Sequence, residues 1–297
     1  MIEIRFEEEH DARMMYEHLL KGAETAHESM SVLLEESTVV VHIPPGDVWC
    51  ADEVLIPAII RFITDVKEEK WILSILEQAF LYRDQDERMQ ILHIVHSLLD
   101  GKLQDIPYKG LQKERRSLLE ASLAEFVQNP ISFSFDSYVK FRLRYYMAYL
   151  VRLTELAIDE YKLEQEYQSF VEMLRQHVYT RKSRLSCLHL VYNGSFTFYD
   201  ERGACLNQER LVQYIDEGIV YNQESYIDPN IIAPLLSIAP KTIYLYTAHI
   251  DDNMIITIRN VFQERVIVHT IGEFEKNDGQ AGKKTVMLPC FSFVLRI

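Results

Sequence analysis

The spacing of apolar residues predicts a helical middle flanked by two regions that contain strands. Apolar and charged residues alternate over residues 2–6, which is the period of a half-buried strand. A helical stretch from about Asp11 to Leu34 follows, and then the β-branched run Thr38–Ile43 predicts a second strand. Together these elements predict an N-terminal β-α-β unit over residues 1–50.

Residues 51–180 carry apolar residues at helical spacing almost throughout. We expect a helical run at Ile59–Tyr82, a second helix that ends at Gly101, and a third at Gln112–Gln128. The longest amphipathic stripe follows, from about Phe135 to His177. At about 1.5 Å per residue a helix of that length spans roughly 60 Å. We therefore expect it to project past its core or to bend.

Two carboxylates interrupt the apolar stripe of this long helix. Glu160 and Glu164 lie one turn apart on the same face. Such a pair could bind a metal or divide acid and base roles. The favoured interpretation is structural: buried carboxylates need Arg, Lys or backbone N–H partners, here at a domain junction.

Short strands and helices replace the helical pattern over residues 181–297. Asn193-Gly194 between two apolar runs predicts a hairpin whose two-residue turn pairs Tyr192 with Ser195. The later run of strand, helix and strand predicts a right-handed β-α-β crossover at Thr242–Thr247, Asp252–Phe262 and Val266–Thr270. The chain is thus expected to be an α+β protein of three regions, 1–50, 51–180 and 181–297.

The last residues of the chain predict a polar loop at Gly272–Lys284 and a possible edge strand at Phe291–Ile297. The loop superficially resembles a phosphate-binding loop. Asn277 occupies the first glycine position of that motif, however, and Lys284 replaces its Ser or Thr. We interpret the segment as a surface loop.

The C-terminal crossover offers the sharpest catalytic hypothesis. His249, Asp251 and Asp252 follow the end of one predicted strand, and His269 closes the other. Neighbouring strand ends lie about 5 Å apart, and open α/β sheets bind ligands at the carboxyl ends of their strands. The alternative is that Asp251 or Asp252 caps the next helix and the histidines have no special role.

Composition narrows the classes of function. The formal net charge of -14 argues against a primary nucleic-acid role, because phosphate binding needs a positive field. The four cysteines are widely spaced and predict reduced thiols instead of a zinc ribbon or a disulfide framework. No stretch resembles a signal peptide or a membrane helix, so we expect a cytoplasmic protein.

One local cluster runs against the acidic composition. Basic residues alternate with tyrosines near the start of the long helix, a mixture that can bind single-stranded nucleic acid through charge and stacking. The residues are Lys140, Arg142, Arg144, Tyr145, Tyr146, Tyr149 and Arg152. Several of those tyrosines belong to the packed stripe, so an RNA-binding module is a third hypothesis only.

Two segments carry a family resemblance. The stretch with Asp159-Glu160-Tyr161, Glu164, Glu166-Tyr167, Phe170 and Leu174 resembles the signature of the YtxC-like family of sporulation proteins. The block Ile258–Val266 is similar to that family too. The resemblance implies a cytoplasmic protein of a spore-forming bacterium. It supplies no catalytic residues.

These observations lead to two functional hypotheses. The first is a non-enzymatic interaction or regulatory protein connected with sporulation, with a protein partner and no cofactor. The alternative is a metal-assisted hydrolase or phosphoesterase in which His249, Asp251 and His269 hold a divalent metal that activates water. The sequence predicts no metal site other than this one.

Overall fold

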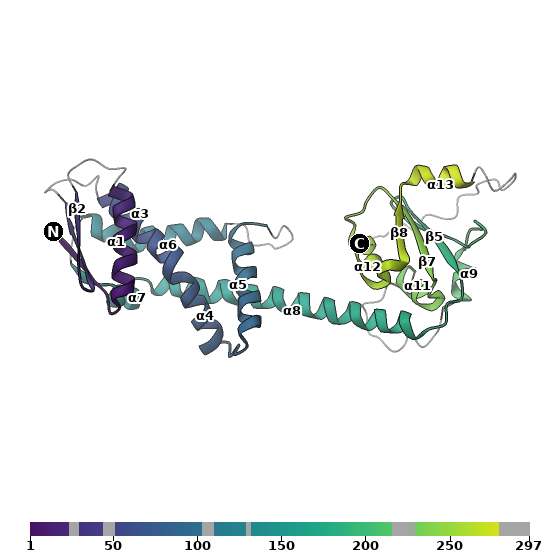
Figure 1. The fold of residues 1–297 in the computed structure, drawn as a ribbon, viewed down its shortest axis with the longest axis horizontal. Coiled ribbons are helices and arrows are strands. Elements are labelled where there is room, and N and C mark those ends of the chain that lie inside the picture. Colours follow the sequence, from purple (N-terminus) through teal and green to yellow (C-terminus); the bar gives the residue numbers. More distant parts are fainter. Residues whose placement is uncertain are drawn as a thin grey trace. The chain divides into compact units, whose positions relative to one another are not determined.

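A computed structural model describes residues 1–23, 30–43, 51–102, 110–128, 132–215, 228 and 230–278. By contacts between residues, the chain divides into two compact units, residues 1–164 and residues 165–297. The fold is α+β, and each unit contains one four-stranded sheet. Figure 1 labels the elements of both units.

The sheet of the first unit has the strand order β2-β3-β1-β4. Its strands are β1 (Ile2–Arg5), β2 (Ser31–Glu35), β3 (Thr38–His42) and β4 (Phe133–Ser134). Strand β1 pairs antiparallel with β3 and parallel with β4. Helix α1 (Glu9–Ala23) follows β1. The opening of the chain is therefore β-α-β-β, with one strand more than expected.

The predicted helix Asp11–Leu34 is wrong from Ser31 onward, where β2 begins. Strand β2 forms a tight hairpin with β3, in which Glu35 pairs with Thr38. The turn between them needs a left-handed residue, and Glu36 adopts a φ of 50° there. This segment is a strand because it pairs with β3, and local helix propensity carries no information about that pairing.

The helical part of the first unit follows the sequence pattern closely. It comprises η1 (Ala51–Leu55), α3 (Ile56–Phe62), η2 (Ile63–Lys67), α4 (Glu68–Gln78), α5 (Gln85–Leu99) and α6 (Leu111–Gln128). Asp84 starts α5 by accepting hydrogen bonds from the backbone N–H groups of Asp86 and Glu87, at 2.9 and 3.0 Å.

The single helix predicted from Phe135 to His177 is wrong at its start. Helix α7 (Phe135–Phe141) ends at a break, and two residues separate it from α8 (Arg144–Thr180). Leu143 is fully buried at the break. Its backbone N–H donates to the carbonyl of Tyr138 at 3.2 Å, five residues back, so the regular hydrogen-bond ladder is lost there.

The sheet and the helices of the first unit share one hydrophobic core. Phe6 follows β1, Phe62 ends α3 and Phe135 begins α7, and their rings meet. The Phe6 centroid lies 5.6 Å from that of Phe62 and 5.1 Å from that of Phe135. Such aromatic contacts add to the free energy gained by burying the rings.

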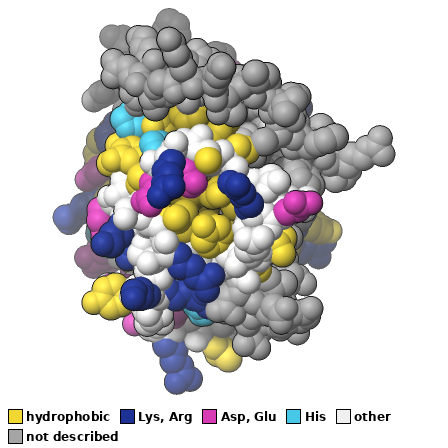
Figure 2. Space-filling view, turned by 90° about the vertical axis from the view of Figure 1, so that its right-hand side faces the viewer, with side chains coloured by type: hydrophobic (Ala, Val, Ile, Leu, Met, Phe, Trp, Pro, Cys, Tyr) yellow, Lys and Arg dark blue, Asp and Glu magenta, His cyan; other side chains and the backbone are white. Residues whose placement is uncertain are grey.

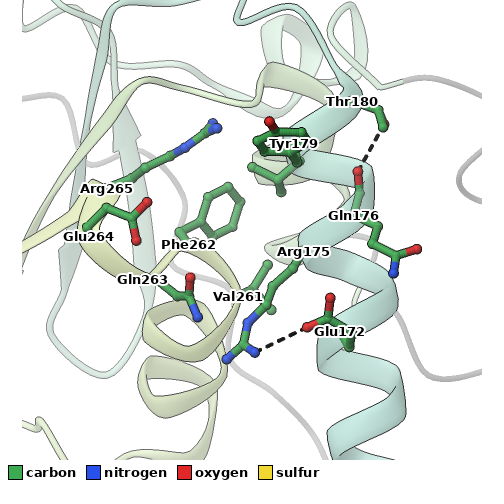
Figure 3. Close-up of a pocket in the computed structure, with 11 residues that line it drawn as sticks. Glu172, Arg175, Gln176, Tyr179, Thr180, Val261, Phe262, Gln263, Glu264 and Arg265 are labelled. Atoms are coloured by element: carbon green, nitrogen blue, oxygen red, sulfur yellow. Dashed lines mark hydrogen bonds and ion pairs between the residues drawn. The ribbon is translucent and has the colours of Figure 1, made fainter.

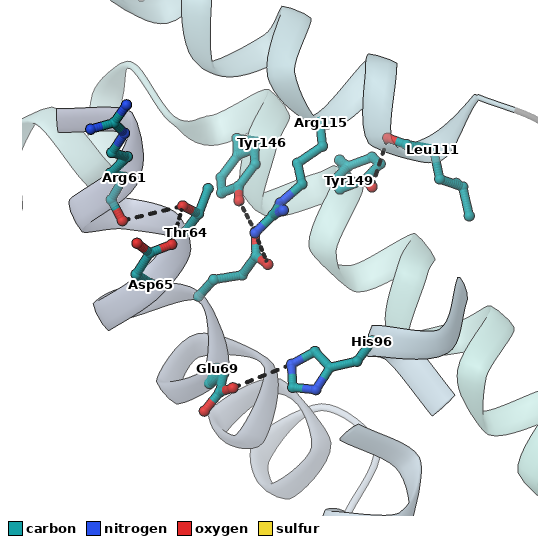
Figure 4. A network of polar contacts seen from close by, with 10 residues as sticks. Arg61, Thr64, Asp65, Glu69, His96, Leu111, Arg115, Tyr146 and Tyr149 are labelled. Atoms are coloured by element: carbon teal, nitrogen blue, oxygen red, sulfur yellow. Dashed lines mark hydrogen bonds and ion pairs between the residues drawn. The ribbon is translucent and has the colours of Figure 1, made fainter. Parts of the chain in front are cut away.

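A buried ionic network joins α4, α6 and α8 within this core. The carboxylate of Glu68, 3% exposed, accepts two hydrogen bonds from Arg115, at 2.8 Å from Nε and 2.6 Å from Nη2. The hydroxyl of Tyr146 also donates to Glu68. Figure 4 shows Arg115 and Tyr146 converging from different helices. Burial and the nearby Glu68 charge raise the pKa of Tyr146, which keeps this donor protonated.

The sheet of the second unit has the order β6-β5-β7-β8. Its strands are β5 (Cys187–Tyr192), β6 (Phe196–Tyr199), β7 (Thr242–Thr247) and β8 (Val266–His269). Strands β5, β7 and β8 run parallel, and β6 is antiparallel to β5. The expected strand–helix–strand order is confirmed, with β7 and β8 as neighbours.

Helices accompany this sheet, and the last residues of α8 pack into the same core. They are α9 (Gln208–Val212), α11 (Ile232–Ile238), α12 (Asn253–Phe262) and α13 (Ile271–Asp278), and a 3-10 turn, η3 (Gln263–Arg265), follows α12. The polar loop predicted at Gly272–Lys284 is therefore wrong up to Asp278. The rest of that loop and the possible strand Phe291–Ile297 lie outside the described residues.

The predicted hairpin register is wrong by one residue. Tyr192 pairs with Phe196, so the loop holds three residues instead of two. Gly194, the middle residue of this loop, adopts a φ of 77°, a conformation that glycine reaches without steric cost. The observed register pairs Leu190 with Phe198, two side chains that the core buries, whereas a one-residue slip would turn one of them to the opposite face.

Within the described residues, no helix is both long enough and apolar enough to cross a membrane.

Candidate functional site

A groove of about 510 Å³ opens between α8 and the end of α12 in the second unit. Val178, Val261 and Phe262 provide its apolar lining. Polar side chains surround these three from both sides, as Figure 3 shows. They are Glu172, Arg175, Gln176, Tyr179 and Thr180 from α8, and Gln263, Glu264 and Arg265 from η3. We call this site the α8–α12 groove.

Hydrogen bonds fix α12 against α8 beside the groove, and both bonds involve Asn260. The Arg175 Nε donates to the backbone carbonyl of Asn260 at 2.8 Å. The Asn260 side-chain amide donates to the hydroxyl of Tyr167 at 2.9 Å. Because main chain and side chain of one residue are both held, the end of α12 has a defined position relative to α8.

Gln263, the residue that follows α12, has a backbone conformation that non-glycine residues rarely adopt. Its φ is 45° and its ψ is -119°, the region that glycine favours at the start of a type II′ turn. With its amide oxygen turned toward Arg175, the Gln263 side chain accepts from Nε and Nη2 at 3.2 Å each. Strained residues of this kind cluster at functional sites.

Replacing Gln263 with glycine tests this strain. We expect Gln263→Gly to raise the free energy of unfolding of the second unit by about 1–3 kcal/mol, because glycine adopts this conformation without steric cost. Chemical denaturation of the full chain, followed by circular dichroism, measures the change. Gln263→Ala is the matched control, since it removes the same amide and keeps the strained conformation. Equal stability of the two variants would contradict the interpretation.

The charges of the groove favour a protein segment over a simple anion. Its two arginines are matched by Glu172 and Glu264, so the formal charge of its lining is zero. Glu172 also pairs with Arg175 at 3.3 Å. Beside these charges, Tyr179 presents an aromatic ring that is 85% exposed. Apolar floors with polar rims are typical of recognition sites for protein segments.

The strand-end residues singled out from the sequence lie in the same unit. Asp252 caps α12 by accepting from the backbone N–H of Met254 at 2.9 Å, and its second oxygen accepts from the hydroxyl of Tyr192 at 2.8 Å. This bond to Asp252 raises the pKa of Tyr192. The His249 ring, an exposed side chain, lies edge-on to Tyr192 with centroids 6.1 Å apart.

His269 has a different set of neighbours. Its Nδ1 lies 2.9 Å from the carboxylate of Glu273 on α13, and its ring stacks on Tyr246 at 5.4 Å. The structure thus brings His249 and Asp252 to Tyr192, and His269 to Glu273, while Asp251 is exposed. Over the ranges that the structure describes, no three His, Cys, Asp or Glu side chains are grouped so as to hold a metal ion.

A third histidine, His189, was missed by the sequence analysis. It stacks on Tyr244 and Tyr246, with centroids 5.0 and 5.8 Å apart, and its Nδ1 lies 3.0 Å from the Tyr246 hydroxyl. Burial lowers the pKa of His189, which favours the neutral ring. Alternation of Leu188, His189 and Leu190 was a signal that His189 faces away from the core.

Glu160 and Glu164 lie where α8 leaves the core of the first unit. Glu160 is half-buried and Glu164 is exposed, and all side chains from Lys162 to Glu166 are exposed. The apolar stripe is therefore interrupted here over more than one turn. A structural role for the two carboxylates at a junction stays a prediction.

A broader pocket of about 750 Å³ lies beside the β5–β6 hairpin and α9. Phe196, Phe198, Leu211 and Met254 are among its lining side chains. Figure 2 shows one side of the molecule on which hydrophobic side chains gather between basic ones. The α8–α12 groove differs from this pocket in its relation to the two family-resembling stretches. Its lining residues 261–265 lie within the block Ile258–Val266, and its α8 lining begins at Glu172, at the end of the other stretch.

Comparisons with known proteins agree with that resemblance. The model of the YtxC-like family matches residues 53–267. A protein of Bacillus subtilis (strain 168), the uncharacterized protein YtxC, is 35% identical over 267 residues, which cover 90% of this chain and 93% of that protein. No solved structure matches.

Proposed function

The chain belongs to the YtxC-like family, and from that premise we propose that it is a cytoplasmic interaction protein of sporulating cells, without enzymatic activity. The α8–α12 groove is its partner site. One observation carries the proposal: the groove lies beside the place where two family-resembling stretches meet, through a hydrogen bond between residues 93 positions apart, Tyr167 and Asn260.

The shape and chemistry of the groove support a protein partner. Its apolar floor offers surface whose burial favours association, at roughly 25 cal/mol per Å². Its rim supplies hydrogen-bond donors and acceptors on both sides, and such groups determine the orientation of a bound partner more than its affinity. Tyrosine and arginine are also the residue types that dominate binding energy at protein interfaces, and here they are Tyr179, Arg175 and Arg265.

Crosslinked capture from sporulating Bacillus subtilis tests the proposal. The bait variant Tyr179→Ser with Glu264→Lys alters two exposed groove residues and leaves the hydrogen bonds of Arg175 intact. We expect a partner that the unaltered chain captures to be reduced about tenfold or more, because truncating a central interface residue typically costs at least 1–2 kcal/mol.

The matched control is Ile267→Ser with Glu201→Lys, which makes the same kinds of change at exposed positions outside the groove. The control should capture the partner normally. Equal capture by the groove variant and the control would overturn the placement of the site. A chain that stays monomeric and captures nothing would overturn the interaction role itself.

The alternative is a metal-assisted hydrolase or phosphoesterase. It draws support from the parallel neighbours β7 and β8, whose ends lie at one edge of the sheet as the hypothesis requires. His249, Asp251 and His269 would hold a divalent metal there, and the metal would activate water. Metal analysis of protein purified without a histidine tag decides: a divalent ion that is lost on His249→Ala would favour this alternative.

A further inference from the structure

The break between α7 and α8 presents an unusual run of side chains on the first unit. Leu143 is fully buried at the break, and Tyr138 and Tyr146 are buried on either side of it. These anchors hold the break against the core. Apart from Leu143, all side chains from Lys140 to Tyr145 are exposed. We call the exposed residues Lys140, Phe141, Arg142, Arg144 and Tyr145 the α7–α8 elbow.

The elbow exposes aromatic surface. Phe141 is 67% exposed and Tyr145 is 63% exposed. Among the side chains that the structure describes, the other strongly exposed aromatic ring is Tyr179 of the second unit. An exposed aromatic side chain costs free energy that burial would recover. Two exposed rings four residues apart, Phe141 and Tyr145, therefore mark a contact surface.

A cation accompanies each of these rings. The Lys140 Nζ lies 5.6 Å from the centroid of the Phe141 ring, and the Arg144 guanidinium carbon lies 4.6 Å from that of Tyr145. Arg144 also donates to the Tyr145 hydroxyl at 2.8 Å. No residue from 140 to 145 is acidic, although the whole chain has a net charge of -14. The elbow is therefore a local basic and aromatic surface on an acidic protein.

We propose that the α7–α8 elbow binds an anionic phospholipid surface. Lys and Arg side chains are attracted to anionic headgroups, and aromatic rings settle at the boundary between headgroups and acyl chains. The elbow offers both, with a cation beside each ring, on a backbone that buried Leu143 holds in place. Peripheral attachment of this kind needs no membrane-spanning helix, and it is independent of the partner site proposed in the second unit.

The positions of the cations favour a lipid surface over single-stranded RNA. Bases bind by stacking on an aromatic face, and the Arg144 guanidinium already lies over the ring of Tyr145. Stacking on that face would displace it. At a membrane surface the cation and the ring both contact the bilayer without separating, because headgroup phosphates accept from the cation while the ring edge enters the interface.

Sedimentation of the purified full chain with lipid vesicles tests the proposal. The probes are vesicles of phosphatidylcholine alone and of phosphatidylcholine mixed with phosphatidylglycerol. We expect binding to the anionic vesicles only, and weaker binding at high salt because ions screen exposed charges. The variant K140Q/R142Q/R144Q should reduce the partition coefficient about a hundredfold, at about fivefold for each cation removed.

A matched control carries the same loss of charge elsewhere on the first unit. R13Q/K113Q/R116Q alters three exposed cations outside the elbow and should bind the vesicles nearly as well as the unaltered chain. A further variant, F141S/Y145S, keeps every charge and should weaken binding about tenfold or more through the loss of apolar contact.

Three results would overturn the proposal. The first is an unaltered chain that fails to sediment with anionic vesicles at low salt. The second is an equal loss of binding in the elbow variant and in the charge-matched control, which would indicate a diffuse electrostatic effect. The third is single-stranded RNA that binds through the elbow residues and is not displaced by anionic vesicles, which would assign the elbow to RNA.

Discussion

Arg115→Ala is expected to lower the free energy of unfolding of the first unit by about 3–5 kcal/mol, because it leaves a buried charge without its partner. Glu68 is almost fully buried, and Arg115 supplies two of its hydrogen bonds. Although burial by itself disfavours the charged guanidinium, its bonds to Glu68 raise the pKa of Arg115. Tyr146 alone cannot neutralise the remaining carboxylate.

Tryptophan fluorescence measures this loss selectively, since both tryptophans of the chain, Trp49 and Trp71, belong to residues 1–164. Glu68→Leu combined with Arg115→Leu is the informative control, because it removes both charges together. We expect the double variant to be clearly more stable than Arg115→Ala. A double variant as unstable as the single one would show that packing, and not the uncompensated charge, explains the loss.

Phe6→Ala is expected to destabilise the first unit by about 3–5 kcal/mol, the usual cost of removing a buried phenylalanine. Phe6 packs on Phe62 and Phe135, so it joins the N-terminal sheet to the helices. The expected result is one unfolding transition, reported by Trp71 on α4 in a Trp49→Phe background, whose midpoint shifts to lower denaturant concentration.

This measurement also tests the division at residue 50 that the sequence suggested. If residues 1–50 folded as a separate domain, the change at Phe6 would leave the signal of Trp71 unaltered. Exposed Phe141, which lies outside the core, provides the control: Phe141→Ala should change the free energy of unfolding by no more than about 0.5 kcal/mol, with a correspondingly small shift of the midpoint. A large shift in that control would contradict the assignment of Phe141 to the surface.

The periodicity of apolar residues correctly predicted the strands and helices that form because of their own residues. Strand β7 was expected at Thr242–Thr247 and lies there, and α12 begins one residue after the expected start. The missed strand β4 depends on a distant partner. Strand β4 has two residues and exists through pairing with β1, 129 residues away, where Ile4 pairs with Phe133. Such pairing leaves no periodic signal in a short segment.

The candidate site was less predictable than the fold. The α8–α12 groove depends on the contact of Arg175 with Asn260 and on the left-handed backbone of Gln263. Neither the contact nor this backbone conformation can be predicted from residue type, since glutamine rarely adopts a positive φ. The sequence showed family resemblance in two stretches that meet beside the groove, where Asn260 donates to Tyr167, but only the fold shows that they meet. The strand-end hypothesis correctly paired β7 with β8, yet its histidines have separate neighbours.

The exposed turn of α8 has a consequence for how the chain opens. From Lys162 to Glu166 every side chain of the helix is exposed, so packing against a core does not stabilise its backbone hydrogen bonds there. Opening that turn exposes little further apolar surface, since Leu163 is already 59% exposed, and it costs far less than unfolding either core. Its amide hydrogens can therefore exchange with solvent, and a protease can cut the chain there, while both hydrophobic cores remain folded.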